Sequence, residues 1–143
     1  GNGTIIKALR EFGYKNHIIA NEIRVEEYDN LKNSGANEIY ISDYLTTFFY
    51  EDITTIITNP PFSIAREFLE VSFERYPKAE VIMLLRVGFL ETKKRYDFWQ
   101  KHDVNRLLVL RDRPKFINNG SDATAYAWFV FNKEKNQRIQ VIA

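Results

Sequence analysis

The residues best suited to chemistry in this chain are four consecutive ones, Asn59-Pro60-Pro61-Phe62. They follow an apolar, β-branched run over residues 54–58 and precede a helical pattern that starts at Ser63. The tetrapeptide is therefore predicted at the carboxyl end of a strand, the edge at which open α/β sheets bind their ligands. An amide, two stiff prolines and an aromatic ring at that edge suit the binding of a flat base by its exocyclic amine.

An exocyclic amine is a poor nucleophile because its lone pair is delocalised into the aromatic ring. The Asn59 side-chain oxygen and the Pro60 carbonyl can accept hydrogen bonds from both amine hydrogens, which favours a pyramidal nitrogen with its lone pair aimed at an electrophile. Proline restricts the backbone around these acceptors, and the Phe62 ring can stack on a base, a contact worth about 1–3 kcal/mol. No residue has to remove a proton first, since the nitrogen becomes acidic as it is methylated. The alternative is a plain strand-to-helix turn in which Phe62 is a core residue.

Three further elements predict a cofactor site upstream of this loop. Gly1-Asn2-Gly3 is a glycine loop that opens a helical pattern, as expected where the backbone approaches a ligand closely. Glu22 follows a short apolar strand, where a carboxylate can accept hydrogen bonds from both ribose hydroxyls of a nucleoside-like cofactor. Asp43 ends the next strand and can accept from an adenine amino group. Singly, a turn, a solvated loop residue or a helix cap would explain each of them.

Other ligand sites fit the sequence less well. A nicotinamide site requires Gly-x-Gly-x-x-Gly, and the third of those glycine positions holds Ile6. A phosphate-binding loop requires Gly-Lys-Ser/Thr after the glycines, which this chain does not have there. His17 and His102 lack metal-ligand spacing, so no metal site is predicted.

The composition fits one domain over residues 1–143 with a packed core, since 45% of the residues are hydrophobic and 15% are aromatic. The sequence has no cysteine, which excludes disulfides and thiolate metal sites and fits a reducing cytoplasm. No apolar run approaches the roughly 18 residues that span a bilayer, so no membrane partner is expected. The net charge is +1, so a nucleic-acid surface must come from local clusters of charge.

Strands and helices alternate along most of the chain, which predicts a parallel α/β sheet. We expect helices over residues 4–12, 25–34, 63–76 and 91–101. We expect strands over residues 17–21, 39–42, 54–58, 81–85, 106–110 and 126–131. The last two strands have no helix between them, which indicates an antiparallel addition at the end. No strand precedes the glycine loop, so we expect the chain to begin inside a larger one.

Basic residues cluster near the predicted ligand edge and are candidates for binding nucleic-acid phosphates. One cluster follows the expected strand over residues 81–85, and the other follows the strand over residues 106–110. The candidates are Lys93, Lys94, Arg95, Arg111, Arg113 and Lys115. A solvated charged face is an equally weighted alternative.

With its Asn-Pro-Pro-Phe loop, the chain resembles the S-adenosylmethionine-dependent amino-methyltransferases, whose catalytic loop reads Asp/Asn-Pro-Pro-Tyr/Phe. More closely, it resembles the phage-type DNA adenine-N6 methyltransferases. The resemblance covers most of residues 1–133, and the later stretches narrow the subfamily. The matching stretches are Thr58-Asn59-Pro60-Pro61-Phe62-Ser63, Leu84-Leu85-Arg86-Val87-Gly88-Phe89-Leu90-Glu91, Lys94-Arg95-Tyr96, Arg113-Pro114-Lys115-Phe116 and Ala125-Tyr126-Ala127-Trp128-Phe129-Val130.

This resemblance implies a Rossmann-like methyltransferase sheet, mostly parallel with an antiparallel final strand, and a family first strand that is missing from this chain. S-adenosylmethionine would lie on Gly1, Asn2, Gly3, Glu22 and Asp43. An adenine flipped out of DNA would enter the loop formed by Asn59, Pro60, Pro61 and Phe62. The chain would act in the cytoplasm of a bacterial cell, encoded either by the phage or by its host. The alternatives are methylation of an RNA base or a protein glutamine amide, and a non-catalytic module that binds nucleic acid or a partner subunit.

Overall fold

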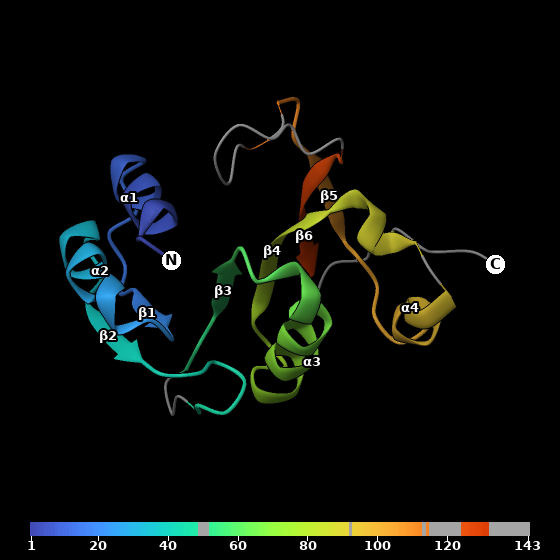
Figure 1. Cartoon of the computed structure of the whole chain (residues 1–143), viewed down its shortest axis with the longest axis horizontal. Coiled ribbons are helices and arrows are strands. Elements are labelled where there is room, and N and C mark those ends of the chain that lie inside the picture. The colour runs from blue at the N-terminus through green and yellow to red at the C-terminus, as the bar shows by residue number, and fades with distance from the viewer. Residues whose placement is uncertain (49–51, 92, 113, 115–123, 132–143) are drawn as a thin grey trace. The chain divides into compact units, whose positions relative to one another are not determined.

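The computed structural model describes residues 1–48, 52–91, 93–112, 114 and 124–131. The chain divides into two units, Gly1–Tyr50 and Glu51–Ala143 (Figure 1). The cofactor residues expected from the sequence belong to the first unit, whereas the Asn-Pro-Pro-Phe loop belongs to the second. The expectation of a single domain stays a prediction.

The first unit pairs two short parallel strands with two helices. Strands β1 (Ile19–Glu22) and β2 (Glu38–Ile41) align Ile19 with Glu38 and Glu22 with Ile41. Their carboxyl ends therefore meet at one edge, and the Ser42 N–H donates to the Glu22 carbonyl at 2.9 Å. The other elements are helix α1 (Thr4–Glu11), the 3₁₀ helix η1 (Val25–Glu27) and helix α2 (Tyr28–Ser34).

The second unit contains a four-stranded sheet in the order β3-β4-β6-β5. Strand β3 pairs in parallel with β4, whereas β6 lies antiparallel between β4 and β5. The strands are β3 (Thr55–Thr58), β4 (Glu80–Arg86), β5 (Arg106–Val109) and β6 (Tyr126–Phe131). The helical segments are η2 (Phe62–Ile64), α3 (Ala65–Arg75), η3 (Val87–Leu90) and α4 (Lys93–Trp99).

One face of this sheet carries the hydrophobic core. Alternate residues point to opposite faces of a strand, and the core side takes every second residue of β4 and β6. Helices α3 and α4 and the segments beside them supply the rest of the apolar cluster. Its buried members are Ala65, Leu69, Val81, Met83, Leu85, Phe89, Phe98, Trp99, Val104, Ala127, Phe129 and Phe131. The intervening residues of β4 and β6, including Arg86 and Tyr126, point to the other face.

The structure confirms the kind of every element expected from the sequence, but two details differ. Apolar residues at helical spacing predict one apolar face for each of the helices over residues 4–12 and 25–34, but three of these residues are exposed: Phe12 is 93% exposed, Val25 70% and Tyr28 44%. Phe12 follows the last residue of α1 as its C-cap, which takes it off the apolar helix face. The second detail is the position of β6, which pairs with β4 as well as β5 and therefore lies inside the sheet.

Candidate functional site

The Asn-Pro-Pro-Phe loop begins one residue after β3 ends at Thr58. Pro60 is buried, whereas Asn59 is exposed at the carboxyl edge of the sheet. Pro61 adopts φ −57° and ψ 125°, and its carbonyl accepts a hydrogen bond from the Ile64 N–H at 3.1 Å. The extended Pro61 and the 3₁₀ turn after it fix the point at which the backbone changes from strand to helix.

Two oxygen atoms of this loop have no hydrogen-bond donor within the described part of the chain. None of the described residues donates a hydrogen bond to the Asn59 side chain or to the Pro60 carbonyl. By contrast, the Pro61 carbonyl accepts a hydrogen bond in the turn into η2. The Asn59 side-chain oxygen and the Pro60 carbonyl are also the two acceptors that the sequence predicted for an amine.

Phe62 lies against two residues that the sequence analysis did not assign to the site. Its ring centroid is 5.5 Å from that of Tyr126, at an interplanar angle of 45°. The Arg86 guanidinium lies over the Phe62 ring, 5.1 Å from its centroid, and Arg86 Nε donates to the Tyr126 hydroxyl at 3.3 Å. Both residues occur in stretches that carry the family resemblance. Their contact depends on the pairing of β4 with β6, which the local sequence does not reveal.

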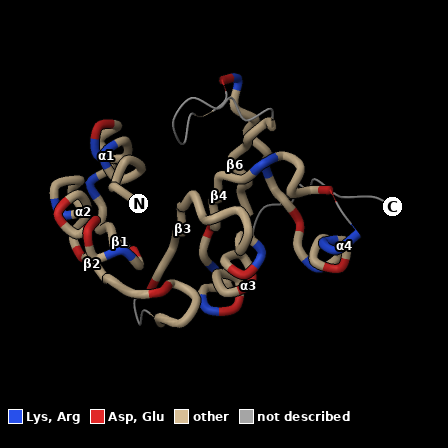
Figure 2. The backbone as a smooth tube through the Cα atoms, viewed as in Figure 1, with Lys and Arg blue, Asp and Glu red and all other residues tan. Residues whose placement is uncertain are grey.

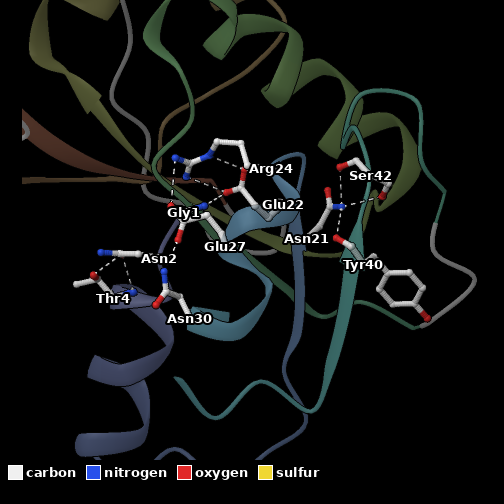
Figure 3. Close-up of polar contacts among 10 residues, drawn as sticks. All are labelled: Gly1, Asn2, Thr4, Asn21, Glu22, Arg24, Glu27, Asn30, Tyr40 and Ser42. Carbon is white, nitrogen blue, oxygen red and sulfur yellow. Dashed lines mark hydrogen bonds and ion pairs between the residues drawn. The ribbon is translucent and has the colours of Figure 1, made fainter. Parts of the chain in front are cut away.

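In the first unit, Glu22 and the glycine loop lie together (Figure 3). The Glu22 carboxylate forms an ion pair with the Gly1 amino group and accepts from the Arg24 backbone N–H and Nε, both at 3.0 Å. Arg24 also pairs with Glu27 at 3.2 Å.

The glycine loop approaches helix α2 more closely than a side chain would permit. Gly3 has φ 79°, and a Cβ atom there would lie 2.6 Å from Ser34 Cβ and 2.8 Å from Ser34 Oγ. The Asn2 side-chain oxygen caps the start of α1 by accepting from the Thr4 hydroxyl at 2.6 Å and its backbone N–H at 3.3 Å. This chain path brings the loop to the carboxyl end of β1, where Glu22 lies.

Asp43 lies two residues beyond β2, at the same edge as Glu22. Its Oδ1 accepts a hydrogen bond from the Leu45 N–H at 2.9 Å, so the side chain also stabilises its own turn. The other carboxylate oxygen leaves Asp43 able to accept from an amino group. Gly1–Gly3, Glu22 and Asp43 are thus gathered at one edge of the first unit, and their acceptors fit a ligand with hydroxyl and amino donors.

The predicted basic residues have different surroundings. Lys93 and Lys94 are exposed on α4, where Figure 2 shows basic residues. Arg95 instead donates to the carbonyls of Phe89 at 2.7 Å and Gly88 at 3.0 Å. Arg113 and Lys115 lie outside the described residues. Arg111 is exposed and pairs with Asp112 at 2.6 Å.

The described part of the chain has neither a metal-binding group nor a membrane-spanning helix. Residues 1–48, 52–91, 93–112, 114 and 124–131 contain no group of three or more metal-ligating side chains placed to hold an ion. In the same residues, no helix is long and apolar enough to cross a membrane.

Comparison with protein-family models and with curated proteins finds no match. Solved structures do match. A candidate RNA methyltransferase from Pyrococcus horikoshii aligns with a TM-score of 0.72 at 21% identity, over 96% of this chain and 71% of that protein. The 23S rRNA methyltransferase ErmE gives 0.60 at 13% identity, over 100% of this chain and 60% of ErmE. A dimethyladenosine transferase from Plasmodium falciparum gives a TM-score of 0.54 at 15% identity, over 82% of this chain and 48% of that protein.

These matches define the fold class. The chain has the Rossmann-like α/β fold of methyltransferases, with parallel strand pairs and an antiparallel strand, as the sequence predicted. It spans less than two thirds of ErmE and of the Plasmodium protein. The three matched proteins are described as acting on RNA or adenosine, and none of them as a DNA adenine methyltransferase.

Proposed function

We propose that this chain is the catalytic part of an S-adenosylmethionine-dependent methyltransferase that methylates the exocyclic N6 amine of adenine in a nucleic acid. The observation that carries the proposal is a pair of acceptors with no hydrogen-bond donor among the described residues, the Asn59 side-chain oxygen and the Pro60 carbonyl, at the carboxyl end of β3. A methyltransferase fold with acceptors for an amine at this edge matches the chemistry of amine methylation. S-adenosylmethionine supplies an electrophilic methyl group on a sulfonium sulfur.

The residues of the loop then have distinct roles. Asn59 and the Pro60 carbonyl accept the two N–H groups of the base, which directs the nitrogen lone pair away from the ring plane. The buried Pro60 and the turn at Pro61 hold the backbone of the loop in place, so that little backbone conformational entropy is lost on binding. Phe62 offers a ring for stacking of the base. After methyl transfer, the positively charged nitrogen loses a proton to water.

In the first unit, Glu22 is the proposed acceptor for the cofactor ribose hydroxyls and Asp43 for its adenine amino group. The Glu22 carboxylate now pairs with Gly1 and Arg24, so a bound ribose would take the place of part of these contacts. Gly1 and Asn2 provide exposed backbone that can approach the cofactor closely, and Gly3, held at positive φ against α2, sets the path of this backbone.

DNA is the proposed substrate, and RNA is the second candidate. The Asn-Pro-Pro-Phe loop and the stretches around Arg86 and Tyr126 support DNA through their resemblance to phage-type adenine-N6 methyltransferases. The names of the matched structures, among them the 23S rRNA methyltransferase ErmE, favour RNA. In both cases the base has to leave its stack to reach the loop.

The test is methyl transfer by the Asn59→Ala variant of the full chain. We expect the rate on an adenine-containing oligonucleotide to fall on the order of a hundredfold, because one of two acceptors is lost, while calorimetry shows unchanged S-adenosylmethionine binding. Asn33→Ala is the matched control, since Asn33 is an exposed asparagine on α2. Mass spectrometry of digested DNA and RNA identifies the methylated base. An Asn59→Ala variant as active as the wild type would contradict the proposal.

A further inference from the structure

Arg86 occupies a fixed position at the carboxyl end of β4. It is the last residue of the strand and pairs directly with Tyr126 of β6. Residues opposite each other in an antiparallel pair place their side chains on the same face of the sheet. The two side chains therefore share the face opposite the hydrophobic core, at the edge where β3 leads into Asn59.

The backbone on both sides of Arg86 is held by hydrogen bonds. The Val87 N–H donates to the Ala125 carbonyl at 2.8 Å, which continues the pairing of β4 with β6 past Arg86. In the following turn η3, the carbonyls of Gly88 and Phe89 accept from Arg95, whose guanidinium lies 4.7 Å from the centre of the Phe89 ring. Arg86 thus projects from rigid backbone, which suits a residue that has to place another side chain.

Three side chains contact one another at this edge and form the Arg86–Phe62–Tyr126 cluster. The guanidinium lies over the Phe62 ring and donates to the Tyr126 hydroxyl, while Tyr126 contacts the Phe62 ring. Tyr126 is 1% exposed, whereas Phe62 is half-buried. A planar guanidinium can cover a ring and donate a hydrogen bond within its own plane at the same time, which a lysine ammonium cannot do in the same geometry.

We propose that Arg86, held by Tyr126, is a positioning residue that sets the orientation of the Phe62 ring for stacking on the target base. This inference rests on the proposed function, since it assigns a role within the same base-binding loop. It also adds β4 and β6 to a site that local sequence placed only on the loop after β3.

The first test reads the ring in the free protein, without reference to activity. The full chain is labelled with 4-fluorophenylalanine, and the Phe62 resonance is identified by its loss in Phe62→Leu. We expect Arg86→Gln to shift this ¹⁹F resonance, and Tyr126→Phe and Arg86→Lys to shift it less. Arg106→Gln is the matched control, because Arg106 is an exposed arginine on the edge strand β5. Circular dichroism verifies that each variant is folded, and an unshifted Phe62 resonance in folded Arg86→Gln overturns the proposal.

The second test measures methyl transfer to the same oligonucleotide. We expect Arg86→Gln to lower kcat roughly fivefold, the factor that corresponds to one cation–π contact, with the KM for S-adenosylmethionine unchanged. Arg86→Lys should recover part of the loss. A lower kcat without a shift of the Phe62 resonance would overturn the positioning role. If the wild-type chain methylates no nucleic acid, the proposed function fails, while the ¹⁹F result still decides whether Arg86 orients Phe62.

Discussion

Arg10 shows how much of the first unit depends on a single side chain. Its Nε donates to the Gly35 carbonyl at 3.0 Å, and its Nη1 donates to the carbonyls of Tyr14 and Asn16 at 2.7 and 2.9 Å. Its Nη2 donates to the Asn37 side-chain oxygen at 2.7 Å. One guanidinium therefore connects the end of α1 to the loops that lead into β1 and β2.

We expect Arg10→Ala to lower the free energy of unfolding of the first unit by about 2 kcal/mol, because charged donors to carbonyls are lost at a partly exposed position. Hydrogen exchange measured by mass spectrometry should then accelerate by roughly 30-fold over residues 1–48. Lys7→Ala is the control, since Lys7 is an exposed basic residue on the same helix. Equal exchange in the two variants would show that the Arg10 hydrogen bonds contribute nothing.

At the residue scale, the sequence could predict those features whose contacting residues lie close together along the chain. The proposed role of Asn59 rests on its immediate neighbours, Thr58 before it and the two prolines after it, so the local pattern was sufficient to propose it. Arg86 was missed because its partner Tyr126 is 40 positions away. Only the register of β4 with β6 makes the two residues neighbours, and alternating apolar residues do not encode which strands pair.

At the scale of elements, the contact of the glycine loop with α2 decides the backbone path at the edge where we propose that the cofactor binds. Gly3 precedes α1 at φ 79°, and Ser34 ends α2 with its hydroxyl donating to the Leu31 carbonyl at 2.6 Å. A left-handed backbone and the space for only a hydrogen atom both require glycine at this position. The backbone conformation and the close contact with α2 therefore explain, without any ligand, why glycine occupies position 3.

We expect Gly3→Ala to destabilise the first unit by about 3 kcal/mol, through backbone strain and the clash with Ser34. S-adenosylmethionine binding measured by calorimetry should weaken as well, because the loop has to move away from Glu22. The double variant Gly3→Ala/Ser34→Gly should recover the part of the loss that is due to the clash, while the strain remains. Gly13 also has a positive φ, but a Cβ atom there would meet open space. Gly13→Ala therefore measures the effect of the backbone strain alone. If Gly3→Ala and Gly13→Ala are equally stable, the close approach to Ser34 has no energetic effect.

The elements themselves were largely predictable from the sequence, and their burial was not. The apolar runs of β4 and β6 and the glycines after α1 and α2 gave the strands and helix ends. Burial depends on which face finds a partner, so the expected inward face of α2 holds a buried Leu31 and an exposed Tyr28. The position of β6 between β4 and β5 also depends on tertiary contacts, because β6 pairs with six residues of β4.

For the whole chain, a net charge of +1 means that the long-range field does not attract nucleic acid. Affinity for a polyanion then has to come from a few local cations, and each phosphate contact contributes a measurable part of the salt dependence. Lys93 and Lys94 at the start of α4 are the exposed pair among the predicted basic residues. Arg95 differs from them because two of its nitrogens donate to backbone carbonyls.

We expect Lys93→Ala and Lys94→Ala each to reduce the slope of log affinity against log salt by about 0.7 for a single-stranded oligonucleotide and by about 0.9 for a duplex. Their effect should be the same for every base sequence, because phosphate contacts position the nucleic acid without reading it. Fluorescence anisotropy over a series of salt concentrations measures both slopes. Lys78→Ala is the control, since Lys78 is exposed in the turn before β4, at the opposite end of that strand from α4. A Lys78→Ala slope that falls as much as the other two would mean that these lysines act only through net charge, and α4 would then not be part of the nucleic-acid surface.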